Sequence, residues 1–124
     1  MNDAADRRTE KRLRYQWPIW FAEDFSGLLT QGQMVDVSSG GAAFTCHADK
    51  CPSPGQQITA RFSVPLYDQE ETFDLSNFIR TGRICRVEQV NPFLRRVAIQ
   101  FSDKLPLKPG EQIQLEEHAE PLPA

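Results

Sequence analysis

The sequence predicts a single, mostly β domain, and three observations support this prediction. The chain has 124 residues, which suits one compact core with modest tails and is too short for two domains of ordinary size. Nine prolines, seven glycines and twelve aromatic residues against two methionines favour short strands and turns over long helices. Apolar residues also recur with a period of two, which is the spacing of half-buried strands.

Six strands are expected between turn signals. The clearest covers 58–64, where apolar and polar residues alternate, and we expect Pro65 to end it. Asn91-Pro92 predicts the turn of an antiparallel pair whose second strand faces inward with Val97, Ile99 and Phe101. The six expected strands are 17–22, 28–38, 42–46, 58–64, 79–87 and 94–101.

Two stretches need separate interpretation. Within 28–38 the alternation places Val35 and Val37 on one face, and Met34, Asp36 and Ser38 on the other, with Gln31-Gly32 as a bulge or turn. The stretch 67–77 holds four acidic residues and predicts an exposed excursion between strands.

Charge and composition divide the chain into a flexible basic arm at 1–14, a barrel at 15–105 and a C-terminal extension at 106–124. The first sixteen residues carry five cations and three anions, whereas the other residues carry nine cations and fourteen anions. For the segment 109–118 both a short helix and a strand remain open, because Pro109-Gly110 resembles the earlier Pro54-Gly55 turn, yet Glu111 to His118 also suits a helix.

The same composition excludes several classes of function. An acidic body argues against binding of DNA or RNA along an extended face, although a small polyanion remains possible. No apolar run approaches the roughly 18 residues of a membrane span, and no secretory signal is recognised, so we expect a cytoplasmic protein without membrane insertion.

The cysteines and histidines do not predict a catalytic or metal site. Cys46, Cys51 and Cys85 are an odd number without an export signal, which favours reduced thiols of structural use. The spacing around His47 is loose for zinc, and neither histidine has a nucleophile beside it. We therefore expect no catalytic residues, no metal and no enzyme activity.

Two motifs carry the functional prediction. The first is Arg7-Arg8-Thr9-Glu10-Lys11-Arg12, an RRxxxR run before the first strand, and the second is Asp36-Val37-Ser38-Ser39-Gly40-Gly41, a DxSxxG run between strands. In this order, and with the Pro-Gly turn and the closing strand 96–101, they resemble a PilZ domain from about Arg7 to Asp103.

The resemblance implies a six-stranded antiparallel β-barrel that binds cyclic di-GMP as its ligand, needs no other cofactor and signals through a protein partner. Arg7 occupies the position that, in this family, influences whether one ligand or a stacked pair is held. Ala98 stands where many members have glycine. The implied ligand residues are Arg7, Arg8, Arg12, Asp36, Ser38, Gly40 and Gly41.

These residue types suit such a ligand. Arginine forks match phosphate oxygens and the O6 and N7 acceptors of guanine, and they stack on bases. Asp36 can accept from a guanine edge, Ser38 can donate to a phosphate, and Gly41 can allow close approach or a positive φ. We expect the arm from Asn2 to Tyr15 to be mobile without ligand and ordered with it.

Three alternatives remain. The arginine motif could start at Arg12, but this places neutral Gln16 where an anion must be met, so we prefer Arg8 and Arg12. A PilZ-like barrel could also serve as a protein-interaction module that does not bind nucleotide. A barrel for single-stranded nucleic acid ranks last, because we expect Trp17, Trp20 and Phe21 to fill the core.

Overall fold

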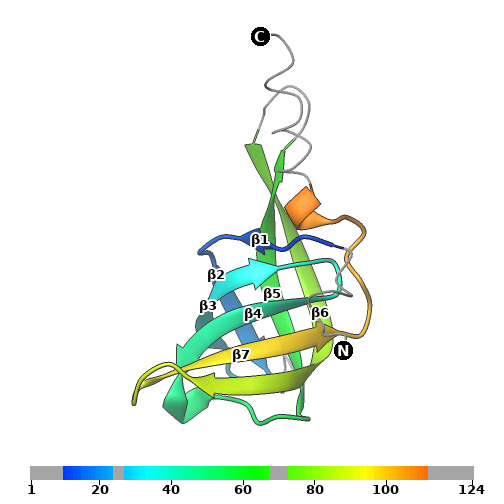
Figure 1. Ribbon diagram of the computed structural model, residues 1–124. Coiled ribbons are helices and arrows are strands. Elements are labelled where there is room, and N and C mark those ends of the chain that lie inside the picture. The colour runs from blue at the N-terminus through cyan, green and yellow to red at the C-terminus, as the bar shows by residue number, and fades with distance from the viewer. Residues whose placement is uncertain (1–9, 24–26, 68–72, 112–124) are drawn as a thin grey trace, which may run out of the picture.

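The computed structural model describes residues 10–23, 27–67 and 73–111. These residues form an antiparallel β structure with a 3-10 turn and a helical turn at 109–111 (Figure 1). The elements are β1 (Leu13–Arg14), β2 (Pro18–Ala22), β3 (Thr30–Val37), β4 (Gly41–His47), η1 (Ala48–Lys50), β5 (Gln57–Tyr67), β6 (Phe73–Gln89) and β7 (Leu94–Phe101).

The strands close into a barrel. Their order is β1-β3-β2-β5-β6-β7-β4, and β4 pairs back onto β3, so six strands form a ring and β1 adds to the end of β3. All pairings are antiparallel. Closure gives each ring strand two neighbours, although β5 beyond Phe62 pairs only with β6, and β6 before Gly82 pairs only with β5. The predicted six-stranded antiparallel barrel is thus confirmed.

The barrel interior is filled by inward-facing residues of every ring strand. Phe44, Phe62 and Met34 are among the largest side chains that are fully buried there. Val97, Ile99 and Phe101 of β7 belong to the same core, as their alternation predicted. Of the three aromatic residues expected inside, only Phe21 is buried in the core. Trp17 packs edge-on against Tyr15, and Trp20 lies under the Arg61 guanidinium, so both stay half-buried.

β5 continues through Pro65, which we expected to end it. Pro65 is in register with Leu75 of β6, and the β5–β6 pairing extends to Tyr67 and Phe73. Proline is tolerated where a strand is paired on one side, and β2 pairs with β5 only as far as Phe62. The described part of the acidic excursion predicted for 67–77 is therefore strand, and its central residues 68–72 lie outside the described residues.

A β-bulge in β3 changes which of its side chains face the core. Met34 pairs with Phe44 and Asp36 with Ala43, so the register shifts at Val35. Because a bulge adds one residue to one strand, Met34 and Val37 both reach the core, whereas strict alternation had placed them on opposite faces. Asp36 consequently lies outside the core cluster, although it remains 7% exposed.

The glycine expected at a bulge or turn has a different use. Gly32 lies inside β3, in register with Ile19 of β2. A Cβ on Gly32 would lie 2.6 Å from the Thr45 carbonyl oxygen of β4. Gly32 therefore permits the close contact of β3 with β4 that closes the barrel.

Part of the predicted N-terminal arm is packed against the barrel. β1 lies within the segment 1–14 that we assigned to the arm, and Leu13 is buried beside Val37. Tyr15 follows, with its hydroxyl donating to the Ser63 carbonyl oxygen at 2.7 Å. The first part of the arm, residues 1–9, lies outside the described residues.

The C-terminal extension starts with a helical turn. Residues 109–111 are helical, and the remainder of the segment 109–118, which the sequence left open between helix and strand, lies outside the described residues. A Cβ on Gly110 would lie 2.3 Å from the Lys11 carbonyl oxygen. The turn thus rests directly on the backbone just before β1, as Figure 1 also shows.

Candidate functional site

The two sequence motifs meet in a short ion pair. Arg12 precedes β1, and Asp36 lies near the end of β3, which is the strand that pairs with β1. The Arg12 guanidinium donates from Nη1 to Asp36 Oδ1 at 2.9 Å. The fold therefore brings together one residue of RRxxxR and one residue of DxSxxG.

A second arginine that the motifs did not include faces the same carboxylate. Arg96 Nη2 of β7 lies 3.7 Å from Asp36 Oδ2. Ala43 of β4 pairs with Asp36 of β3 on one side and with Ala98 of β7 on the other. Arg96 lies two residues before Ala98, so the two side chains are on the same face of β7. The small alanine side chains leave room for the long Arg96 side chain to reach across β4.

Asp36 is nearly buried, whereas its two partners are partly open to solvent. The exposed fractions of the side chains are 10% for Asp36, 34% for Arg12 and 44% for Arg96. One carboxylate faces two guanidinium groups, so this cluster keeps one net positive charge. A cluster of this kind can receive a small anion on its solvent side.

The DxSxxG motif forms the hairpin turn between β3 and β4. Ser38 donates its backbone N–H to the Gly41 carbonyl oxygen at 2.8 Å, and its hydroxyl lies 3.4 Å from the same oxygen. Ser39 and Gly40 make up the tip of the turn. Their carbonyl oxygens accept backbone hydrogen bonds from Leu105 and Phe101, respectively. The turn is thus anchored to the last residue of β7 and to the segment that follows it.

The two glycines of the motif differ in their surroundings. A Cβ on Gly41 would lie 2.5 Å from the Ile99 carbonyl oxygen, whereas a Cβ on Gly40 would meet nothing within 4 Å. Of the described glycines, only Gly55 has a positive φ. Gly41 therefore serves the close approach of β4 to β7 and not the positive φ that the sequence had left open.

The turn also holds a carboxylate of the arm. Both oxygens of Glu10 accept hydrogen bonds from Ser39, at 2.6 Å from the backbone N–H and 2.6 Å from the hydroxyl. Neither residue was among the predicted ligand residues. Arg7 and Arg8, which were, lie outside the described residues.

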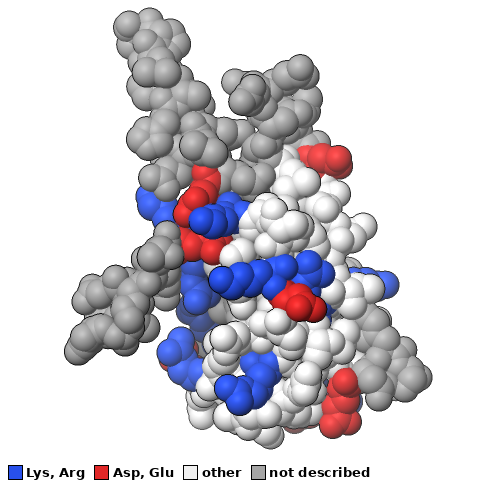
Figure 2. Space-filling view, turned by 90° about the vertical axis from the view of Figure 1, so that its right-hand side faces the viewer, with Lys and Arg blue, Asp and Glu red and all other residues white. Residues whose placement is uncertain are grey.

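Charges of both signs share this side of the barrel. Figure 2 looks onto the side toward which the β7 arrow points in Figure 1. Basic and acidic side chains lie next to one another near one edge of the described surface, and further basic side chains are scattered over it. The basic side chains on this face form no uninterrupted track of the kind that neutralises a long nucleic acid.

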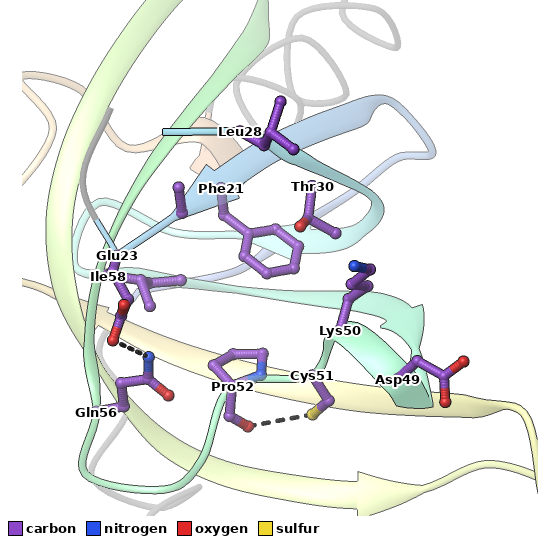
Figure 3. A pocket seen from close by; sticks show the side chains of 11 residues that line it. Phe21, Glu23, Leu28, Thr30, Asp49, Lys50, Cys51, Pro52, Gln56 and Ile58 are labelled. Atoms are coloured by element: carbon purple, nitrogen blue, oxygen red, sulfur yellow. Dashed lines mark hydrogen bonds between the residues drawn. The ribbon is translucent and has the colours of Figure 1, made fainter. Parts of the chain in front are cut away.

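A separate hollow lies at the opposite end of β3. It has a volume of about 270 Å³ and opens between the end of β2, the start of β3 and the segment around η1 (Figure 3). Apolar Phe21, Leu28 and Pro52 line it together with Lys50 and Gln56. None of the predicted ligand residues that the structure describes borders this hollow.

The thiols do not form a site in the described part of the chain. Cys46 is buried, Cys51 is half-buried and Cys85 is exposed, and all three are free. Burial, with a further contribution from neighbouring Cys51, raises the pKa of the Cys46 thiol to about 12, which disfavours the reactive thiolate. Across 10–23, 27–67 and 73–111, no three metal-ligating side chains gather.

Comparison with known families decides the identity of the chain. The family model for the PilZ domain matches residues 6–118. The chain belongs to the PilZ domain family. The match includes both motifs and extends into the segment that we had set apart as a C-terminal extension. PilZ domains are a family of cyclic di-GMP receptors, and no family of enzymes is indicated for this one.

A solved structure supports the fold of this PilZ domain. It is the inhibitor of motility MotI/DgrA of Bacillus subtilis, which aligns with a TM-score of 0.62 at 14% sequence identity. The alignment covers 90% of this chain and 49% of the other, so the PilZ domain spans about half of that protein. No curated protein matches the chain. Within the described residues, no helix has the length and apolar character to cross a membrane.

Proposed function

We propose that this PilZ domain is a receptor for cyclic di-GMP that signals through a protein partner. The observation that carries the proposal is the Arg12–Asp36 ion pair, because it joins the two ligand motifs of the family in one place. Arg8, on the same arm, and Ser38, two residues after Asp36, complete the proposed set, together with Arg7, Gly40 and Gly41.

The chemistry of the cluster supports this ligand. A cyclic dinucleotide offers two phosphates and guanine edges, and arginine forks bind both kinds of acceptor. Asp36 is acceptor-only when ionised and can take guanine N–H groups. In the free protein Arg12 and Asp36 are each other's partners. We propose that ligand binding replaces this ion pair. Arg12 then contacts a phosphate of the ligand, and Asp36 contacts a guanine base.

Calorimetry with purified protein and cyclic di-GMP tests the proposal. We expect Arg12→Ala to weaken binding by about 1.5 to 3 kcal/mol, the range for hydrogen bonds to charged groups. Arg61→Ala is the matched control, because Arg61 lies over Trp20 on a different part of the barrel and should leave affinity unchanged. The absence of binding by the wild-type protein well above micromolar ligand would leave the nucleotide-free interaction module as the better description.

The same titration gives the ligand stoichiometry, which the sequence left open. Two ligands per chain would support a stacked pair, and we expect Arg7→Ala to change that number if Arg7 has the role implied by the family. Unchanged stoichiometry in Arg7→Ala would mean that other residues determine how many ligands bind.

A protein partner is proposed because a small barrel without a catalytic constellation can report a ligand only by changing its surface. Affinity capture from source cells, with and without cyclic di-GMP, tests this step. We expect the set of captured proteins to differ between the two conditions. Identical sets would support constitutive docking instead.

A further inference from the structure

The Glu10–Ser39 contact attaches the described part of the arm to the barrel just before β1. Each carboxylate oxygen receives one donor of the same serine, at 2.6 Å in both cases. Hydrogen bonds to an ionised acceptor are stronger than neutral ones, and two parallel bonds also fix direction. Ser39 is only 7% exposed, so solvent competes little for its donors.

The position of this contact relates it to the ion pair. Glu10 is two residues before Arg12, and Ser39 is three residues after Asp36. The two contacts therefore link the same two segments at neighbouring points, and they continue the β1–β3 pairing beyond Leu13. Ser39 is a firm anchor, because its carbonyl oxygen accepts the Leu105 N–H at 2.8 Å.

We propose that Glu10 is a positioning residue, which holds the arm on the DxSxxG turn and so keeps Arg12 over Asp36 before any ligand arrives. Its effect on affinity rests on the proposed function, whereas its effect on the arm does not. Fixing a backbone segment is entropically unfavourable. When Glu10 has already docked the arm, ligand binding does not have to offset the entropy of ordering it, and the site is preorganised.

Hydrogen exchange of the ligand-free protein tests the positioning role. We expect Glu10→Gln to speed amide exchange in residues 11–15 by roughly tenfold, because the charge that strengthens both bonds is lost. Glu88→Gln is the matched control, since Glu88 faces Arg86 on β6 and should leave the arm unchanged. The thermal midpoint by circular dichroism should be the same in both variants, which separates a local effect from general destabilisation.

A double-mutant cycle tests whether Glu10 acts through Ser39. We expect Ser39→Ala to speed the same exchange, and the double variant to add little to Glu10→Gln. Ser39→Ala keeps the backbone N–H that also bonds Glu10, so fully additive effects would mean that the Ser39 hydroxyl does not hold the arm through Glu10 and would overturn the proposal. Equal exchange in wild type and Glu10→Gln would overturn it as well.

Calorimetry then tests whether docking of the arm by Glu10 strengthens ligand binding. We expect Glu10→Gln to bind cyclic di-GMP several-fold more weakly than wild type with Arg12 intact. Tighter binding would show that Glu10 competes with the ligand and would refute the positioning role. If wild type binds no cyclic di-GMP, the proposed function fails, while the exchange measurements still decide the role of Glu10 in the free protein.

Discussion

Asp36 is a nearly buried carboxylate that remains available to bind a ligand. A buried carboxylate that loses its partner is strongly unfavourable. Asp36 has two partners, Arg12 at 2.9 Å and Arg96 at 3.7 Å. If Arg12 turns to a ligand phosphate, Arg96 still faces the carboxylate. The second arginine thus makes release of the first less costly.

This argument predicts the behaviour of Arg96→Ala. We expect it to lower the free energy of unfolding by less than about 1 kcal/mol, because the pair is partly exposed. We expect the affinity for cyclic di-GMP to fall by more than this amount, since Arg12 is then the main partner of Asp36 and is less free to bind the ligand. Urea titration and calorimetry measure the two effects. Arg95→Ala is the control, because Arg95 donates to the Asn91 and Leu94 carbonyl oxygens instead. Unchanged affinity in Arg96→Ala contradicts the argument.

The buried phenol of Tyr15 should make the stability of the fold decrease at alkaline pH. Burial raises the pKa of Tyr15 above its usual value near 10. Only the neutral phenol donates to Ser63, so its stabilising effect is complete below about pH 10 and is lost as pH rises through the raised pKa. We expect Tyr15→Phe to lose about 1 kcal/mol at neutral pH.

The free energy of unfolding, measured by urea titration from neutral to strongly alkaline pH, checks this expectation. Wild type should lose its advantage over Tyr15→Phe at the alkaline end. Two curves that stay parallel over the whole range would mean that the Tyr15 hydroxyl is not linked to folding.

At the scale of elements, Gly41 allows β4 to pack closely against β7. An added Cβ meets the Ile99 carbonyl oxygen, which is backbone and cannot turn away. We therefore expect Gly41→Ala to destabilise the fold by about 1 to 3 kcal/mol, the range for overpacking. Gly40→Ala is the matched control, because that position is open. Thermal unfolding compares the two variants, and equal midpoints would rule out this steric role of Gly41.

Most elements followed from local sequence, and the exceptions have non-local causes. Alternation located β2 and β5, and turn signals helped to locate β4 and the β6–β7 pair. It failed at Pro65, because the tolerance for proline depends on where the neighbouring β2 stops. It also failed across Val35, because a bulge is set by the pairing with β4 and not by the residues of β3 alone.

The site shows the same division. Arg12 and Asp36 could be predicted, because each belongs to a motif with a recognisable order. Arg96 could not, since its part depends on the β4–β7 register, which brings residues 60 positions apart into contact. Glu10 was visible only as one more charge of the arm, and its partner Ser39 was an unspecified position of the motif.

At the scale of the whole molecule, ligand and stability should be linked. A ligand that binds only the folded state stabilises it by mass action, by about 2.7 kcal/mol at roughly 100 times its dissociation constant. For a chain of this size we expect the unfolding midpoint to rise on the order of 10 °C with cyclic di-GMP. Differential scanning calorimetry measures the shift, and Arg12→Ala should show a smaller one. An equal rise with cyclic di-AMP would indicate a nonspecific effect.

The resting of Gly110 on the Lys11 backbone has a consequence for the order in which the molecule is made. The arm leaves the ribosome before the barrel, and its neighbours on the finished surface are synthesised later: Asp36, then Arg96, then Gly110. Contacts so distant in sequence form late and slowly during folding. A growing polypeptide that has not yet reached β7 lacks half of the charges around Asp36. On the proposed function, we therefore expect a chain to respond to cyclic di-GMP only after its translation has passed β7.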